Sequence, residues 1–165
     1  MMARWFLMVS VVFVLGAPVA RAQTVYVVRH AEKVDDSRDP PLNADGAARA
    51  LALRHVLRDA GVGHVYVTPY VRNKETARPL AELVRVVPRV LPAGDVTGVV
   101  AALRKHQAGD VILVVGHSDT VPELLQRLCG EKVVLQHGDY DNLFVARRDG
   151  AGFVLTRLHY GAPRP

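Results

Sequence analysis

An α/β fold with a mostly parallel sheet is the class that the sequence predicts, for two reasons. Short apolar runs, of which Val25–Val28 and Val111–Val115 are the clearest, alternate with longer stretches of helical periodicity. Parallel strands covered by helices are buried on both faces, so they read as continuous apolar runs. Near the end of the chain, two further runs flank the turn Asp149–Gly152 and predict an antiparallel hairpin. We therefore expect a three-layer α/β/α sandwich whose mostly parallel sheet carries an antiparallel edge hairpin.

Residues 1–22 have the pattern of a secretory signal peptide. Arg4 precedes the apolar stretch Trp5–Leu15, and the segment Ala20–Ala22 supplies small residues at the cleavage positions. The apolar stretch is shorter than the roughly 20 residues that a membrane-spanning helix needs, so an uncleaved anchor is the weaker alternative. We expect one domain over residues 23–165, periplasmic or secreted, with no stable membrane span after cleavage.

Charge and cysteine content narrow the class of partner. The formal net charge of +5 falls to +3 when the two arginines of the expected signal peptide are removed. This mild excess suits a small anionic substrate, and the absence of a basic run gives no indication of nucleic acid binding. A single cysteine, Cys129, excludes a disulfide within the chain, so the stability has to come from the core.

The order of the expected elements follows the apolar runs and the residues that end them. A polar segment over 31–42 should be an exposed loop able to overhang a site, and Asn43 is placed to cap a helix. Pro79 should break or restart the second helix. The expected elements are strands over 24–29, 64–67, 84–90 (weak), 111–116, 143–147 and 153–159, and helices over about 43–60, after Pro69, over 97–106 and over 120–130.

Three polar side chains follow expected strands at the point where each strand ends. His30 comes after the first strand with Arg29 beside it, Thr68 comes after the second, and His117 follows the strand over 111–116. Ligands of parallel α/β sheets bind beyond the carboxyl ends of the strands. We therefore expect these side chains to line one crevice.

Histidine and arginine at such a crevice suit phosphoryl transfer without a metal ion. The ordinary imidazole pKa of about 6.5 leaves much of the ring neutral and nucleophilic at pH 7. Arg29 and Arg72 offer planar guanidinium groups that match phosphate oxygens and stay charged. Arg72, near the start of a helix, would add the favourable helix dipole.

With these motifs the chain resembles the histidine phosphatase superfamily, which is also called phosphoglycerate mutase-like. Arg29-His30-Ala31 resembles its Arg-His-Gly motif, Thr68–Arg72 resembles its Ser/Thr-Pro-x-x-Arg motif, and Gly116-His117-Ser118 resembles its second-histidine motif. The resemblance implies that His30 is the nucleophile that becomes phosphorylated. It also implies that Arg29, Arg72 and His117 complete the phosphate pocket.

The general acid is less well defined by this resemblance. Where one branch of the superfamily has an aspartate directly after the second histidine, this chain has Ser118, and Asp119 follows one place later. We rank Asp119 first as proton donor and Glu32 second, and the segment 86–95 offers only Asp95. The alternative for Asp119 is that it caps the helix beginning near residue 120.

Other motifs of enzyme chemistry are absent from the sequence. No His/Cys/Asp/Glu cluster has zinc spacing, and neither a glycine-rich phosphate loop nor a Gly-x-Ser-x-Gly elbow is present. We predict no required metal and no cofactor, and we expect the remaining histidines, at 55, 64, 106, 137 and 159, to be structural or exposed. The stretch Asp139–Asp141 is interpreted as a turn with solvated acids.

The expected function is hydrolysis of phosphomonoesters through a phosphohistidine intermediate on His30. Two alternatives stay open: a phosphatase for phosphohistidine in proteins, and a phosphate-binding envelope protein without turnover. A mutase is less favoured, because the chain lacks insertions that would close over a phosphoglycerate. The sequence identifies neither the natural substrate nor the oligomeric state.

Overall fold

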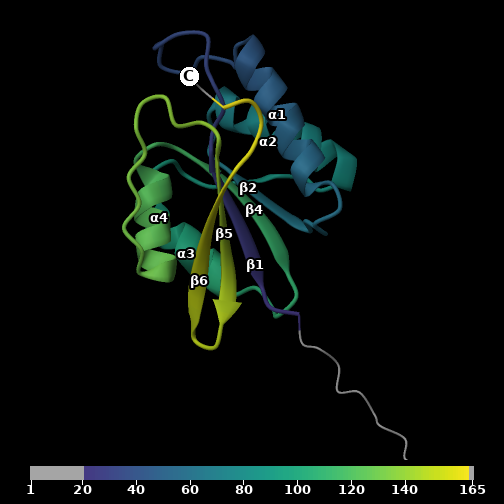
Figure 1. Cartoon of the computed structure of the whole chain (residues 1–165), viewed down its shortest axis with the longest axis vertical. Coiled ribbons are helices and arrows are strands. Elements are labelled where there is room, and N and C mark those ends of the chain that lie inside the picture. The colour runs from purple at the N-terminus through teal and green to yellow at the C-terminus, as the bar shows by residue number, and fades with distance from the viewer. Residues whose placement is uncertain (1–20, 164–165) are drawn as a thin grey trace, which may run out of the picture.

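The structure of the chain is a computed structural model that describes residues 21–163 (Figure 1). The predicted signal peptide therefore lies almost entirely outside the described residues. Within them, no helix is both long and apolar enough to span a membrane. The elements are β1 (Thr24–Arg29), α1 (Ala44–Leu57), β2 (His64–Val67), α2 (Val71–Val84), β3 (Arg89–Val90), α3 (Val96–Arg104), β4 (Val111–Gly116), α4 (Thr120–Cys129), β5 (Asn142–Asp149) and β6 (Gly152–His159).

A six-stranded sheet of order β3-β2-β4-β1-β5-β6 forms the middle of the molecule. β1 pairs in parallel with β4, from Thr24 opposite Val111 to Arg29 opposite Gly116, and antiparallel with β5 on its other side. The parallel strands β3, β2, β4 and β1 are followed at one edge by the β5–β6 hairpin. The predicted fold class, a mostly parallel sheet with an antiparallel edge hairpin, is confirmed.

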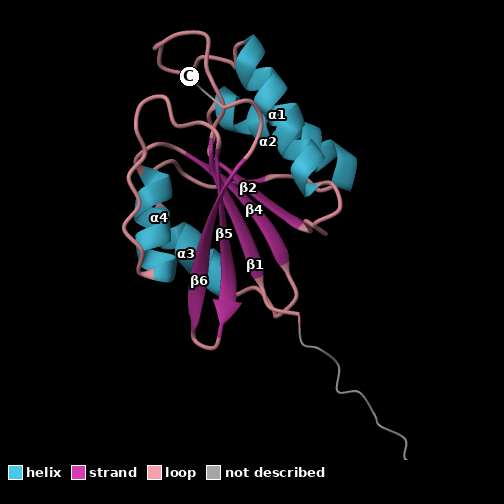
Figure 2. Ribbon diagram, viewed as in Figure 1, coloured by secondary structure: helices cyan, strands magenta, loops and turns pink. Residues whose placement is uncertain are grey.

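Helices cover both faces of the sheet, with α1 and α2 on one side and α3 and α4 on the other (Figure 2). Each face has its own apolar core. Side chains alternate between the two cores along a strand: in β4, Ile112 and Val114 pack towards α3 and α4, while Leu113 and Val115 pack towards α1 and α2. This two-sided burial is the reason why β4 is apolar along its whole length.

The first helix begins where the sequence predicts and is anchored by a buried ion pair. The side chain of Asn43 accepts a hydrogen bond from the backbone N–H of Gly46 at 2.8 Å. A Cβ atom at Gly46 would overlap the carbonyl oxygen of Glu32, so only glycine allows this close approach. One turn further on, Arg49 binds both carboxylate oxygens of Glu32, and it also donates to the carbonyl oxygen of Tyr160 at 2.9 Å.

The expectation that Pro79 breaks the second helix is wrong, because α2 runs without interruption from Val71 to Val84. Proline in a helix interior removes one backbone hydrogen bond and usually kinks the chain. Here Ala77, Leu80 and Ala81 on both sides of Pro79 are buried against the sheet. Their packing outweighs the loss of that hydrogen bond.

Three further boundaries differ from the sequence prediction. The weak strand expected over 84–90 is reduced to Arg89–Val90, since Pro88 has no N–H to offer the sheet and Arg85 turns with a φ of 57°. The loop 31–42 is exposed over residues 34–39, as expected, but Glu32 and Pro40 are buried. Cys129 is half-buried against the α3–α4 core, and burial raises the pKa of its thiol to about 11, which suits packing.

Candidate active site

The carboxyl ends of β1, β2 and β4 bring together three of the predicted side chains. His30 follows β1, Thr68 follows β2 and His117 follows β4. The rings of His30 and His117 meet edge to face with their centroids 5.4 Å apart. Thr68 Oγ1 lies 3.0 Å from Nε2 of His117. All three residues are buried, so the two imidazoles at the strand ends have little contact with water.

One hydrogen bond fixes the tautomer of His30. Its Nδ1 lies 2.8 Å from the carbonyl oxygen of Ala31. A carbonyl oxygen only accepts, so Nδ1 carries the proton and Nε2 keeps its lone pair. The backbone N–H of Ala31 in turn donates to Thr76 Oγ1 at 2.9 Å, and the Thr76 hydroxyl donates to the carbonyl oxygen of Arg72 at 2.7 Å. A single buried threonine of α2 thus holds the loop of His30 and the first turn of α2 together.

Burial and nearby arginines keep both imidazoles neutral. Burial lowers the pKa of His30 to about 3, and the positive charges of Arg29 and Arg72 act in the same direction. The pKa of His117 falls to about 4, mainly through burial and then through Arg72, whereas Asp119 opposes this shift. At pH 7 the site therefore contains two uncharged imidazoles between two permanent cations. An anion is the ligand that this arrangement favours.

Arg29 is held in place by the segment before β5. Its guanidinium lies 4.1 Å from the ring centroid of Tyr140, and its Nη1 donates to the carbonyl oxygens of Gln136 and His137 at 3.2 and 2.9 Å. Tyr140 is 4% exposed, and its ring also contacts His30. The interpretation of this stretch as a turn with solvated acids did not include the buried contact of Tyr140 with Arg29. The signal available in the sequence was an aromatic residue shortly before the closing hairpin.

Arg72 lies in the first turn of α2 beneath the loop that follows His30. Its guanidinium is 4.3 Å from the ring centroid of Tyr70, whose edge packs on His117. Its Nη1 lies 3.7 Å from a carboxylate oxygen of Asp39, and this carboxylate also accepts from the backbone N–H of Val71. The expectation that loop 31–42 overhangs the site is met at this contact.

The start of α2 and the start of α4 are fixed to the same strand end. Asn73, which is fully buried, donates through its side-chain amide to the carbonyl oxygens of Val115 and Gly116 at 3.0 and 3.1 Å. A Cβ atom at Gly116 would lie 2.9 Å from a methyl group of Val121, so this glycine lets α4 pack closely. The first turn of α2, which carries Arg72, and the start of α4, which follows His117, are thereby held at the same strand end.

The two candidate acids occupy very different places. Glu32 is 2% exposed and accepts three hydrogen bonds from Arg49, so its carboxylate is fixed in an ion pair. Asp119 is exposed, caps α4 by accepting from the N–H of Thr120 at 2.8 Å, and lies close enough to His117 to influence its pKa. Asp95 caps α3 in the same manner. Only Asp119 therefore combines accessibility with proximity to the imidazoles.

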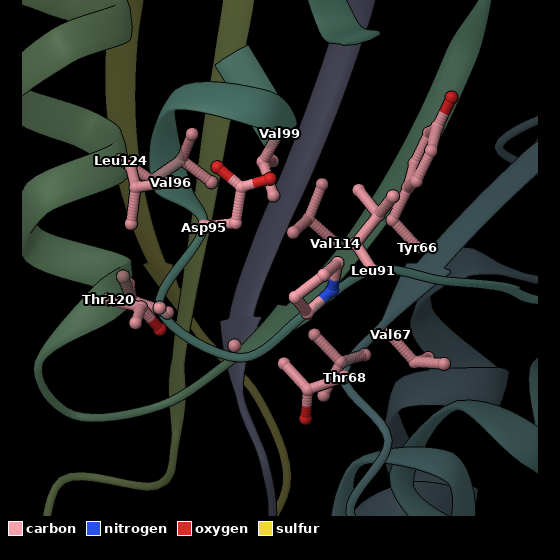
Figure 3. A pocket seen from close by; sticks show the side chains of 15 residues that line it. Tyr66, Val67, Thr68, Leu91, Asp95, Val96, Val99, Val114, Thr120 and Leu124 are labelled. Carbon is pink, nitrogen blue, oxygen red and sulfur yellow. The ribbon is translucent and has the colours of Figure 1, made fainter. Parts of the chain in front are cut away.

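A small apolar cavity lies beside the crevice, between the sheet and the helices α3 and α4. Figure 3 shows Thr68 and Thr120 at one side of it and three valines, Val96, Val99 and Val114, at the other. Its lining contains no cationic side chain, so it offers nothing to a phosphate group. The cationic side chains that suit an anion, Arg29 and Arg72, lie instead at the strand ends beside His30 and His117.

One family model and several solved structures are similar to this chain. Residues 25–93 match the family model of the histidine phosphatase superfamily, branch 1, a stretch that contains Arg29, His30 and Arg72 but ends before His117. No curated protein sequence matches the chain.

Solved structures match over most of the chain. A structure of the protein histidine phosphatase SixA with tungstate has a TM-score of 0.70 at 20% identity, covering 82% of this chain and 96% of that one. The fold is that of the histidine phosphatases. A mycobacterial glucosyl-3-phosphoglycerate phosphatase has the same fold, with a TM-score of 0.64 at 15% identity, covering 87% of this chain and 100% of that one. A phosphoglycerate mutase from Plasmodium falciparum has a TM-score of 0.62 at 16% identity, covering 87% of this chain and 95% of that one.

Proposed function

We propose that this chain is a phosphatase that hydrolyses phosphomonoesters through a phosphohistidine intermediate on His30. The observation that carries the proposal is the hydrogen bond from His30 Nδ1 to Ala31, which leaves Nε2 as an uncharged nucleophile. The pKa of about 3 keeps it so at every physiological pH. The match of residues 25–93 to the histidine phosphatase superfamily supports the same conclusion.

The first chemical step transfers the phosphoryl group to His30. Arg29 and Arg72 bind the phosphate oxygens, and the buried Nε of Arg72, which has no partner among residues 21–163, is one donor available for this. An incoming phosphate dianion competes with Asp39 for Arg72. Nε2 of His30 then attacks phosphorus, the P–N bond forms, the P–O bond to the alcohol breaks, and the leaving oxygen takes up a proton.

The second step returns the enzyme to its starting state. Water attacks phosphorus, the P–N bond breaks, and His30 recovers its lone pair as inorganic phosphate leaves. We assign the proton transfers of both steps to Asp119: protonated, it supplies the leaving alcohol, and ionised, it accepts the proton of the attacking water.

Trapping the intermediate tests the role of His30. After brief incubation with a ³²P-labelled phosphomonoester, the full chain should carry a label that is lost in acid and stable in base. His30→Ala should carry none, while His55→Ala, which removes an exposed histidine of α1, should be labelled like the wild type. A label that persists in His30→Ala would exclude this nucleophile.

Leaving-group dependence tests the role of Asp119. An alkyl phosphate needs a proton donor, whereas p-nitrophenolate leaves without one. We expect Asp119→Asn to lower kcat/KM by about 10²-fold for an alkyl phosphate and by much less for p-nitrophenyl phosphate. An equal loss for both substrates would assign Asp119 to helix capping alone.

A second function, removal of phosphate from phosphohistidine in proteins, is favoured by one observation. Asp119 is already engaged as the cap of α4, and a phosphoramidate needs less help from an acid because its nitrogen is readily protonated. The similarity to the fold of SixA, a protein histidine phosphatase, is compatible with it. A phosphohistidine peptide assayed beside a panel of phosphomonoesters separates the two. Binding of phosphate without hydrolysis of any of these substrates would instead support the non-catalytic envelope protein.

We propose a periplasmic or secreted location on the basis of the signal-peptide pattern. The hydrogen bonding of the domain supports cleavage before Gln23: its buried side chain donates to the carbonyl oxygen of Leu103 at 2.7 Å, and its own carbonyl accepts from Arg148 at 2.9 Å. N-terminal sequencing of the exported protein should begin at Gln23. An N-terminus upstream of the apolar stretch would support the anchored form.

A further inference from the structure

Three potential metal ligands lie together at the amino ends of β2 and β4. His64 is the first residue of β2, Asp110 directly precedes β4, and His106 lies in the turn after α3. The ligand atoms of these three side chains are all within 4.8 Å of one another. Asp110 Oδ2 is 3.0 Å from Nδ1 of His106 and 3.9 Å from Nε2 of His64. The chain order separates the two histidines by α2 and α3, so no local spacing motif reveals the cluster.

This cluster is far from the phosphate crevice. β4 is six residues long, and its other end leads to His117. At about 3.3 Å per residue, the two sites are separated by about 20 Å along the strand. The catalytic residues proposed above therefore have no direct contact with the cluster.

The turn that carries His106 and Asp110 is held in shape before any ion binds. Oδ2 of Asp110 accepts from the backbone N–H of Gln107 at 2.9 Å, and the N–H of Asp110 donates back to the carbonyl oxygen of Gln107 at 3.2 Å. Gly109 completes the turn with a φ of 92°. Every side-chain hydrogen bond of Asp110 uses Oδ2, so within residues 21–163 its Oδ1 accepts none.

Tyr66 contacts the ring nitrogen of His106 that faces away from Asp110. Its hydroxyl lies 2.8 Å from Nε2 of His106, and Tyr66 itself is only 5% exposed. A hydrogen bond on the second ring nitrogen is the usual support of a metal-binding histidine, because it fixes the orientation and tautomer of the ring. The side chain of His106 is 12% exposed, whereas those of Asp110 and His64 are 30% and 44% exposed. The cluster is thus supported on one side and open to solvent on the other.

We propose that His64, His106 and Asp110 bind a divalent transition-metal ion, with Zn²⁺ as the representative. Two imidazoles and one carboxylate suit Zn²⁺ and Cu²⁺, whereas Mg²⁺ and Ca²⁺ require oxygen ligands. Metal bound at Nδ1 of His106 displaces the proton that this atom donates to Asp110. The proton moves to Nε2, and Tyr66 then accepts this hydrogen bond instead of donating it, so the proton count is unchanged.

The geometry also limits the affinity of the site. Ligand atoms around a tetrahedral Zn²⁺ are about 3.4 Å apart, given bonds of about 2.0–2.1 Å. The distance of 3.9 Å between His64 and Asp110 therefore has to shorten, and the distance of 3.0 Å between His106 and Asp110 has to widen slightly. His64, the most exposed of the three, can make this movement. His64 and His106 line a surface pocket to which Arg89 and Lys105 also contribute. With only three protein ligands and these two positive charges nearby, we expect micromolar affinity. The bound ion would fasten the start of β2 to the α3–β4 turn and stabilise the fold by mass action.

Calorimetry of the full chain with Zn²⁺, after removal of metals with EDTA, tests the proposal. We expect one ion per chain and a melting temperature that rises with Zn²⁺ concentration. His64→Ala and Asp110→Asn should each weaken binding at least tenfold. His159→Ala is the matched control: it removes the histidine of another His–Asp pair, in which Nδ1 lies 3.0 Å from Asp141, and should leave binding unchanged.

A second measurement covers the case in which a variant folds poorly. Co²⁺ bound to the wild-type chain should give d–d absorption bands of a four- or five-coordinate ion, and competition with Zn²⁺ should abolish them. Absence of any saturable binding would overturn the proposal. Binding that survives in His64→Ala but is lost in His117→Ala would also overturn it, because the ion would then occupy the phosphate crevice.

Discussion

The two ends of strands β2 and β4 place histidines in opposite electrostatic surroundings. At the carboxyl ends, His117 and its neighbour His30 are buried, and Arg29 and Arg72 lower the pKa of both. At the amino ends, His64 and His106 are more open and share the carboxylate of Asp110.

This difference shows that the companions of an imidazole decide its ligand. Between two arginines, a neutral ring is suited to attack an anion, because the cations hold the phosphate and the ring keeps its lone pair. Beside a carboxylate, the same ring is suited to bind a cation. One residue type is thus suited to two chemistries at opposite ends of the same strands.

The largest expected effect is that a substitution at one end of the strands abolishes the function of that end and leaves the function of the other end unchanged. His30→Ala should lower kcat/KM for p-nitrophenyl phosphate by about 10⁴-fold or more and leave Zn²⁺ binding unchanged. His64→Ala should do the reverse, since it lies at the other end of β2. Steady-state kinetics and calorimetry on the same preparations measure both quantities. A comparable loss of hydrolysis in His64→Ala would show that the ends are coupled.

The next prediction tests whether Glu32, the carboxylate closest in sequence to His30, takes part in the chemistry. Glu32→Gln leaves the charge of Arg49 buried without its partner, so we expect the free energy of unfolding to fall by about 3 kcal/mol. Activity per folded molecule should stay the same. Urea unfolding and active-site titration provide the two values. Unchanged stability combined with a lower kcat would return Glu32 to the list of acids.

A third, smaller effect is the dependence of stability on pH. Unfolded histidines take up protons below about pH 6.5, whereas folded His30 stays neutral until about pH 3, so the unfolded state binds more protons in between. The free energy of unfolding should therefore fall as the pH is lowered from 6.5. When the pH is lowered by about two units, the free energy of unfolding of His30→Asn should fall by about 2 kcal/mol less than that of the wild type. Urea unfolding at several pH values measures this. If the free energies of unfolding of the two proteins fall equally with pH, the assignment is contradicted.

The smallest effect concerns the hydroxyl group that supports His117. Thr68→Val removes the contact of 3.0 Å to Nε2 and keeps the shape of the side chain. The expected loss in kcat/KM is severalfold, corresponding to about 1 kcal/mol for one hydrogen bond. An unchanged rate would show that the ring of His117 is positioned by Tyr70 and the backbone alone.

The sequence was most informative where local pattern decides the outcome. Continuous apolar runs predicted β1 and β4, and the residues that follow them, His30 and His117, were predicted to meet because parallel strands end at one edge. The helix through Pro79 was missed, because buried neighbours can outweigh a missing hydrogen bond and only the packing shows this.

Contacts between distant segments set the limit of such predictions. Tyr140 stacks on Arg29 across most of the chain, and no periodicity points from one to the other. In the same way, His106 and Asp110 meet His64 only once the sheet is assembled. Side chains whose role depends on burial, such as Arg49 in its ion pair, look like surface residues in the sequence.

The place of β1 in the sheet determines when the surroundings of His30 can be completed as the chain folds. This strand, which leads to the nucleophile, is made first but is paired between β4 and β5, which are made much later. Long-range pairing of this kind folds slowly compared with local contacts. Arg29 reaches its partners only after residue 140 exists, so a nascent or shortened chain carries His30 without a pocket. The surroundings of His30 are therefore completed late, after nearly the whole domain is available.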